Sequence, residues 1–464
     1  MLKPHTHTAL ALALSAALCA ALVPSAQAAE ASFDFGSSHT FLGFGTQVWL
    51  NNKNPRVTGQ MLKDLNARFV RVSLNPKVPL RELREGMTVE EGLALIKKHD
   101  SAEQRDRLTE FRDQMRSLGI TPHLIFWRVP EPWVKTQAKK VGSKSKANYA
   151  QPELIDDYAR SIVAQLLYLK GLGIEPDGIE LVNEPHGAWG TKFVPAHYAQ
   201  LALSTRKAMN EHGLQNIKID GPGTGLRQFD HFIGGMKEAN AEKALGYVSA
   251  HVYDTPEVLA DRRDSGTASF MGQGKFGPIM ITEFGVKQHS DEDDFFADDE
   301  LQVTSPEFAV HAASSAVLLL SKGASGLIYW QIQDFAWQKK GKTHGMMSAS
   351  GERRPVAHAL QALFSKVPPG AAVAQRPINL PTGVYGAALQ SGKNSYVMLV
   401  NSTDQVQEIS AKLLGGSKAC MSVSQVEAWS PAGRGDAAIR QAKADNCTLK
   451  ATLGKQAVGT VILQ

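Results

Sequence analysis

FVRVSL (residues 69–74) and PIMITEFG (residues 278–285) are short runs in which apolar side chains fall on both faces of an extended chain. This pattern is typical of parallel strands that helices cover on both sides. Similar runs recur between residues 43 and 368, and the predicted strands are Thr46–Leu50, Phe69–Leu74, Pro122–Trp127, Gly178–Asn183, Ile217–Asp220, Gly246–Val252, Pro278–Glu283 and Gly326–Gln331.

Amphipathic helices separate these strands. One is predicted to begin after Ser101, with Gln104 in the capping-box position, and to end at Gly119. Its apolar face consists of Leu108, Phe111, Met115 and Leu118. Eight strands alternating with helices predict an α/β fold, a (β/α)8 TIM barrel. An open doubly wound sheet remains an alternative, although no Gly-x-Gly-x-x-Gly motif leads from an early strand into a helix.

Beyond residue 368 the chain has short β-rich runs separated by turn residues, such as Ser395–Val400, Val423–Trp429 and Val458–Leu463. They predict a small C-terminal β-sandwich. The expected organisation is a signal peptide at 1–28, an N-terminal strand at 29–42 that joins the sandwich, a catalytic barrel at 43–367 and the sandwich at 368–464.

The first 28 residues have a basic start, an apolar run and the small-residue pattern Ala26-Gln27-Ala28, which predict a cleaved export signal. We therefore expect a periplasmic or extracellular protein without a membrane span. The net charge of +5 comes from scattered residues, so a nucleic-acid partner is not expected. Cys420 and Cys447 could form one disulfide in such a compartment, and no Cys/His cluster predicts a metal site.

Two glutamates end predicted barrel strands. Glu184 closes GIELVNEP (residues 178–185) and Glu283 closes PIMITE (residues 278–283). The active-site loops of a parallel barrel gather at the carboxyl ends of its strands. Hydrolysis of a glycosidic bond with retained configuration needs two carboxyl groups there, about 5–5.5 Å apart.

The motifs Val182-Asn183-Glu184-Pro185-His186-Gly187 and Ile281-Thr282-Glu283-Phe284-Gly285 resemble those of clan A glycoside hydrolases, which are retaining enzymes. The resemblance covers about residues 30–367. Asn-Glu-Pro-His-Gly is most similar to family 5, whereas the Gly43-Phe44-Gly45 opening, the Trp127–Trp133 loop and the sandwich resemble families 30 and 39.

This resemblance implies that Glu184 is the general acid/base and Glu283 the nucleophile. It further implies that Arg71 keeps the nucleophile ionised, that Asn183 binds the sugar 2-hydroxyl, that Tyr253 of His251-Val252-Tyr253 contacts the nucleophile, and that Trp330 lies under the sugar. His186 and Trp127 are further candidates for sugar contacts, as are Trp133, Trp189 and Trp337, although plain packing explains these three equally well.

Charge placement predicts a lowered pKa for Glu283, beside Arg71, and a raised pKa for Glu184, which has no obvious cation of its own. No cofactor is expected. The acidic residues between 291 and 300 could bind calcium, but a solvated loop is the simpler interpretation.

The expected function is therefore an exported retaining glycosidase that cleaves a β-linked polysaccharide or oligosaccharide by double displacement. Glucan, mannan, galactan and mixed exopolysaccharides all suit this chemistry, in an endo or an exo mode. One alternative is a transglycosylase on the same scaffold. The other is a barrel that binds glycans without cleaving them, although such a protein would be expected to lack one of the two carboxylates.

Overall fold

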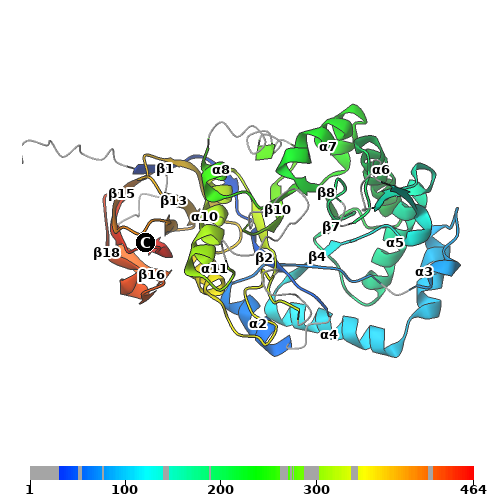
Figure 1. Cartoon of the computed structure of the whole chain (residues 1–464), viewed down its shortest axis with the longest axis horizontal. Coiled ribbons are helices and arrows are strands. Elements are labelled where there is room, and N and C mark those ends of the chain that lie inside the picture. Colours follow the sequence, from blue (N-terminus) through cyan, green and yellow to red (C-terminus); the bar gives the residue numbers. More distant parts are fainter. Residues whose placement is uncertain are drawn as a thin grey trace, which may run out of the picture.

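The computed structural model describes residues 31–464 apart from 51–54, 76–77, 139–145, 188–189, 262–269, 272–273, 275, 287–301, 336–342 and 416–421. Figure 1 shows a helix-covered barrel beside a smaller β-sheet module, with helices α10 and α11 between them. Within the described ranges, no helix is long and apolar enough to cross a membrane.

Eight parallel strands form the closed barrel and confirm the predicted fold class. In order around the barrel they are β2 (Gly43–Gln47), β3 (Phe69–Val72), β4 (Thr121–Ile125), β7 (Gly178–Glu180), β8 (Lys218–Gly225), β9 (Tyr247–Val252), β10 (Ile279–Phe284) and β11 (Gly326–Tyr329). Each lies in or overlaps the run that predicted it. The first begins three residues earlier than expected, because Gly45 lets β2 approach β3 closely: a Cβ there would lie 2.6 Å from the Phe69 carbonyl oxygen.

Helices cover the outside of the barrel (Figure 1). Among the described residues they are α2 (Pro55–Asp64), α3 (Val89–His99), α4 (Ala102–Leu118), α5 (Ile155–Gly171), α6 (Pro195–Glu211), α7 (Leu226–Glu238), α8 (Pro256–Ala260), α10 (Pro306–Lys322) and α11 (Pro355–Phe364). Helix α4 begins and ends as the sequence predicts: the Ser101 side chain accepts a hydrogen bond from the Gln104 N–H, and Gly119 closes the helix at φ 66°. A two-stranded hairpin, β5 (Val134–Ala138) and β6 (Lys146–Ala150), follows β4.

The second module is built mainly from antiparallel strands and matches the predicted C-terminal β-sandwich. Its ten strands are β1 (Ala31–Thr40), β12 (Ala372–Ile378), β13 (Val384–Ser391), β14 (Asn394–Asn401), β15 (Gln407–Leu414), β16 (Val423–Ser430), β17 (Gly433–Arg434), β18 (Ile439–Asp445), β19 (Thr448–Leu453) and β20 (Val458–Leu463). The N-terminal strand β1 lies inside this sheet, antiparallel to β12 and parallel to β15.

Strand β14 joins the two modules because both of its faces are buried. Tyr396, Met398 and Val400 belong to the hydrophobic core that continues into the barrel, whereas Val397 and Leu399 belong to the core inside the sandwich. On the barrel side, the rings of Phe364 and Phe44 stack 4.3 Å apart, and the Thr460 hydroxyl donates to the Leu363 carbonyl oxygen at 2.9 Å. The alternation of side chains along a strand thus gives barrel and sandwich a shared boundary.

Candidate active site

The two candidate catalytic glutamates meet at the mouth of the barrel. Glu184 follows β7 by four residues, and Glu283 lies near the end of β10. Both side chains are largely buried, and a carboxylate oxygen of each lies within 4.8 Å of the other. Glu184 adopts φ 43°, a left-handed conformation that non-glycine residues adopt at a cost of about 1–3 kcal/mol. Such strain is typical of positions where the direction of a side chain matters.

Arg71 binds Glu283 and the residues around Glu184. It points into the barrel from β3 and is fully buried. Its guanidinium donates to Glu283 Oε2 at 3.0 Å, to Asn183 Oδ1 at 2.9 Å and to Glu180 Oε2 at 2.7 Å. A fourth partner, Gln47 of β2, accepts at 3.0 Å. Because a guanidinium carries five N–H donors in a rigid fork, Arg71 fixes the orientation of all these side chains at once.

His251 and Tyr253 approach the same carboxylates from β9 and the residues after it. His251 Nδ1 lies 3.0 Å from Glu184 Oε1 and 3.7 Å from Glu283 Oε2, while Nε2 lies 3.3 Å from Glu180 Oε1. The Tyr253 hydroxyl donates to Glu283 Oε1. The structure therefore brings Arg71, Asn183, His251 and Tyr253 together around the glutamate pair.

The predicted directions of the two pKa values are wrong for the free site. Burial is the largest single influence on Glu184 and favours its neutral form, but the hydrogen bond with His251 and the positive charges of His251, His186 and Arg71 together outweigh it and lower the pKa of this carboxyl group. Burial raises the pKa of Glu283, and the nearby His251 and Arg71 cations offset this only in part. Burial of His251 lowers the pKa of its imidazole, but the negative charge of Glu283 and the hydrogen bonds with Glu180 and Glu184 outweigh this and raise the pKa to about 10.

The reason for this reversal is the position of His251. The sequence places Arg71 beside Glu283 but does not reveal that an imidazole lies against Glu184. The mobile proton of the Glu184–His251 contact therefore resides on His251 in the free site. To act as an acid, Glu184 would use this mobile proton, which it shares with His251.

A group of aromatic rings borders the site. The rings of Trp127 and Trp330 are 5.8 Å apart, and Trp49 lies 5.5 Å from the first and 5.8 Å from the second. Phe335 packs on Trp49 at 5.2 Å, and the Arg71 guanidinium lies 5.7 Å from the Trp127 ring. All four rings are partly exposed, so they can present apolar faces to the C–H groups of a sugar.

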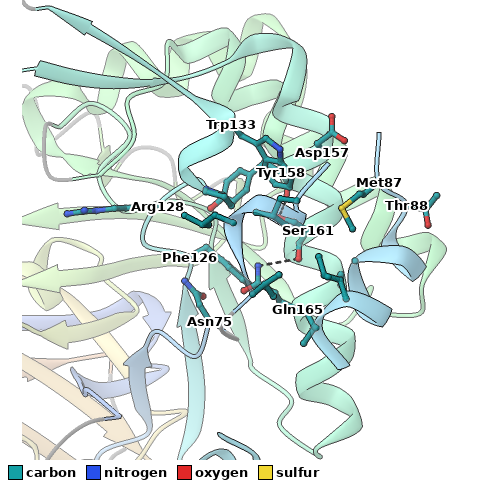
Figure 2. Close-up of a pocket in the computed structure, with 18 residues that line it drawn as sticks. Asn75, Met87, Thr88, Phe126, Arg128, Trp133, Asp157, Tyr158, Ser161 and Gln165 are labelled. Atoms are coloured by element: carbon teal, nitrogen blue, oxygen red, sulfur yellow. Dashed lines mark hydrogen bonds between the residues drawn. The ribbon is translucent and has the colours of Figure 1, made fainter. Parts of the chain in front are cut away.

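Two other residues predicted for the site, His186 and Trp133, were candidates for sugar contacts. His186 is half-buried, and burial lowers its pKa, which favours the neutral imidazole. Trp133 is buried and lines a separate cavity of about 130 Å³, whose lining does not include Glu184 or Glu283. Figure 2 shows Trp133 there with Tyr158 and Phe126. Trp133 therefore packs away from the glutamate pair.

Trp189, Trp337, Cys420, the acidic residues of 291–300 and the export signal lie outside the described residues, so the expectations about them stay predictions. Cys447 lies between β18 and β19.

Sequence reasoning missed Glu180, Trp49 and Gln47, three side chains that touch the site. Glu180 stands in the run GIELVNE that was already assigned to a strand. A buried carboxylate in such a strand needs a cation, and Arg71 on β3, two strands away around the barrel, is its partner. That pairing is the signal that could have identified Glu180.

Glu184, His251 and Glu283 could each direct one ligand atom to a metal ion, since these atoms lie within 4.8 Å of one another. The Arg71 guanidinium already binds Glu283 and would repel a second cation. A Glu184 that shares a proton with His251, beside a Glu283 bound by Arg71, is therefore the better account of this cluster.

No protein-family model matches the chain, and no curated protein matches its sequence. Solved structures do match. A family 30 endoxylanase from Clostridium papyrosolvens C71 superposes with a TM-score of 0.68 at 17% identity, over 94% of this chain and 100% of its own. An endo-β1,6-glucanase gives 0.62 at 14%, over 94% of both chains. A family 39 glycoside hydrolase from Bacteroides cellulosilyticus WH2 gives 0.57 at 13%, over 92% of this chain and 81% of its own.

These comparisons define the class: the chain has the barrel-and-sandwich fold of family 30 and 39 glycoside hydrolases. The resemblance to clan A, with family 30- and 39-like features, is thus confirmed at the level of the fold.

Proposed function

We propose that this protein is a retaining glycosidase acting on a β-linked polysaccharide or oligosaccharide, with Glu283 as nucleophile and Glu184 as general acid/base. The observation that carries the proposal is the distance between the two carboxylates. Their oxygens approach within 4.8 Å, which suits direct attack by one group and leaves no room for the water that an inverting enzyme activates.

The chemistry runs in two displacements. In the first, a Glu283 oxygen attacks the anomeric carbon, the glycosidic C–O bond breaks, and the leaving oxygen takes the proton from Glu184. In the second, water attacks that carbon, Glu184 takes a proton from the water, and the bond to Glu283 breaks. Arg71 and Tyr253 donate hydrogen bonds to Glu283, and both favour the carboxylate that must attack.

The aromatic border supports a carbohydrate substrate. Trp49, Trp127 and Trp330 lie within 6 Å of one another beside the catalytic pair, where a sugar ring could stack. The structural neighbours include an endoxylanase and an endo-β1,6-glucanase, and the second name specifies a β-linked glycan. A panel of β-linked polysaccharides with product sizing would identify the sugar and the endo or exo mode.

Substitution of the two glutamates tests the roles. Glu283→Gln should lower activity by several powers of ten with every substrate. Glu184→Gln should retain the first step on an aryl glycoside whose leaving group needs no protonation, so the glycosyl-enzyme should accumulate. Glu211→Gln, on the exposed end of α6, serves as the matched control and should behave like the unaltered protein.

Azide distinguishes the two carboxylates. With Glu184→Ala it should replace water and give a β-glycosyl azide, whereas with Glu283→Ala it should give the α-azide. Exchanged stereochemistry would mean that the roles are reversed. Full activity of both glutamate variants would refute the proposed function.

We further propose that residues 1–28 direct export to the periplasm or the medium. N-terminal sequencing of the protein recovered from these fractions should find Ala29 first, and an unprocessed cytoplasmic chain would contradict export.

A further inference from the structure

Glu180 is a buried carboxylate to which the two displacements assign no task. It is only 2% exposed and lies in β7, four residues before Glu184. Its Oε2 accepts from Arg71 at 2.7 Å, and its Oε1 accepts from the Thr282 hydroxyl at 2.5 Å and lies 3.3 Å from His251 Nε2. Burial alone would raise the pKa of Glu180, but the Arg71 guanidinium and His251 hold it well below its usual range.

The neighbouring strands leave space for this carboxylate. At Gly223 in β8, with φ 62°, a Cβ would lie 2.7 Å from Glu180 Oε1. Four strands therefore shape the surroundings of Glu180. Strands β3, β9 and β10 contribute Arg71, His251 and Thr282, and β8 contributes Gly223, which has no side chain. Such convergence leaves the carboxylate one orientation, with each oxygen facing a particular donor.

These contacts decide where the hydrogens of His251 lie. An ionised carboxylate only accepts hydrogen bonds, so His251 Nε2 must carry a hydrogen to bind Glu180 Oε1. Nδ1 then faces Glu184 Oε1 at 3.0 Å, and one mobile proton lies in that contact. In the competing arrangement, Nε2 accepts a hydrogen bond from the terminal nitrogen of Arg71, which is 3.5 Å away. The single hydrogen of the neutral ring would then lie on Nδ1.

We propose that Glu180 is a positioning residue that binds the Nε2 hydrogen of His251 and thereby turns Nδ1 toward Glu184, where it shares the proton that Glu184 delivers to the leaving oxygen. The proposal rests on the proposed function, because it assigns Glu184 the part of general acid. The charged and titratable groups around His251 are Arg71 from β3, Glu180 and Glu184 from β7 and the residues after it, Glu283 from β10, and Tyr253 and His186 from the adjoining loops.

In this arrangement a carboxylate (Glu180) orients a histidine (His251) beside a group that exchanges protons (Glu184). In the first displacement the shared proton leaves Glu184 for the glycosidic oxygen. In the second, a water proton arrives at Glu184 and restores the shared state with Nδ1. The hydrogen on Nε2 stays on the imidazole throughout, bound to Glu180.

The first test observes the imidazole directly. In protein labelled with 15N-histidine, the ring nitrogens of His251 are assigned by their loss in His251→Gln, and their shifts are followed across pH. Nε2 should remain protonated at every pH at which the protein is folded and active. A neutral His251 with its hydrogen on Nδ1 would overturn the proposal, and this measurement needs no variant of Glu180.

The second test uses Glu180→Gln and the pH profile of kcat/KM. Loss of the negative charge weakens proton binding by His251 and Glu184, so the basic limb should move to lower pH by about 1 to 3 units. The kcat should fall more for a substrate with a poor leaving group than for an activated aryl glycoside, with KM little changed. Equal losses for both substrates with an unmoved limb would mean that Glu180 only stabilises the fold.

Asp220→Asn is the matched control. Asp220 is also a fully buried barrel carboxylate paired with a histidine, His123 of β4, but it does not contact the catalytic pair. This variant should lose stability and keep the basic limb in place.

If Glu184→Gln and Glu283→Gln abolish activity while Glu180→Gln keeps the parent profile, the positioning role fails and the proposed function stands. If the catalytic variants keep full activity, the proposed function itself fails.

Discussion

Replacement of Tyr253 by phenylalanine removes one hydroxyl group from the candidate nucleophile. Tyr253 follows β9, and its hydroxyl donates to Glu283 Oε1, while Arg71 binds the other carboxylate oxygen at 3.0 Å. The change leaves the ring and the charge of the site intact. It therefore isolates what a single hydrogen bond contributes to keeping Glu283 ionised.

The size of the effect follows from the charge on the acceptor. A hydrogen bond to an ionised group contributes about 1.5–3 kcal/mol. One pKa unit corresponds to about 1.36 kcal/mol, so the pKa of Glu283 should rise by about 1–2 units in Tyr253→Phe. The carboxylate that attacks then becomes protonated at a higher pH, and the acid limb of the kcat/KM profile should move upward by this amount.

The assay is the pH dependence of kcat/KM for an aryl glycoside. Tyr247→Phe is the control: Tyr247 also donates to a carboxylate, Asp177 Oδ2 at 2.6 Å, but the pair lies where β7 and β9 begin, at the opposite end of the barrel. Its acid limb should not move. An unmoved or lowered acid limb in Tyr253→Phe would refute the account of how Glu283 is held ionised.

Three further predictions concern the aromatic border of the site, the module boundary and the cysteines. Trp49→Ala should raise KM for the polysaccharide about three- to tenfold, as expected for the loss of about 1 kcal/mol of stacking, whereas Trp133→Phe should leave it unchanged; equal effects would place Trp49 outside the sugar path. Phe364→Ala should lower the free energy of unfolding in urea by about 3–5 kcal/mol, because this ring is 1% exposed against Phe44, while Val406→Ala, at 54% exposure, should cost about 0.5 kcal/mol or less. Cys420 and Cys447 should resist thiol labelling in the unreduced, denatured protein, with a bridge that contributes about 3–4 kcal/mol, and two labelled thiols would exclude it.

The sequence predicted the barrel well because its strands carry a strong local signal. Parallel strands between helices must be apolar on both faces, and a run such as FVRVSL satisfies this without reference to the rest of the chain. The glutamate pair was predictable for a related reason, since both residues lie near the carboxyl ends of strands, and all these ends of a parallel barrel meet at one mouth.

The electrostatics of the site could not be predicted in the same way. Whether His251 turns toward Glu184 depends on the register of β9 against β10, where His251 pairs with Glu283, and on Glu180 behind it. These are contacts between residues 67 or more positions apart, and no local pattern encodes them. The pKa directions therefore reversed, although Glu184, Glu283 and His251 had been named correctly; Glu180 had not.

Strand β1 gives the folding of the chain a fixed order. It pairs with β12 and β15, so its partners lie more than 330 residues later in the chain, and the whole barrel stands between them. During synthesis the first strand must remain without these neighbours until nearly the entire polypeptide has been made. The barrel can gather its own strands earlier, whereas the second module closes only when both ends of the chain meet. A stalled chain that ended anywhere in the barrel would therefore carry an unpaired edge strand, which is a site for aggregation.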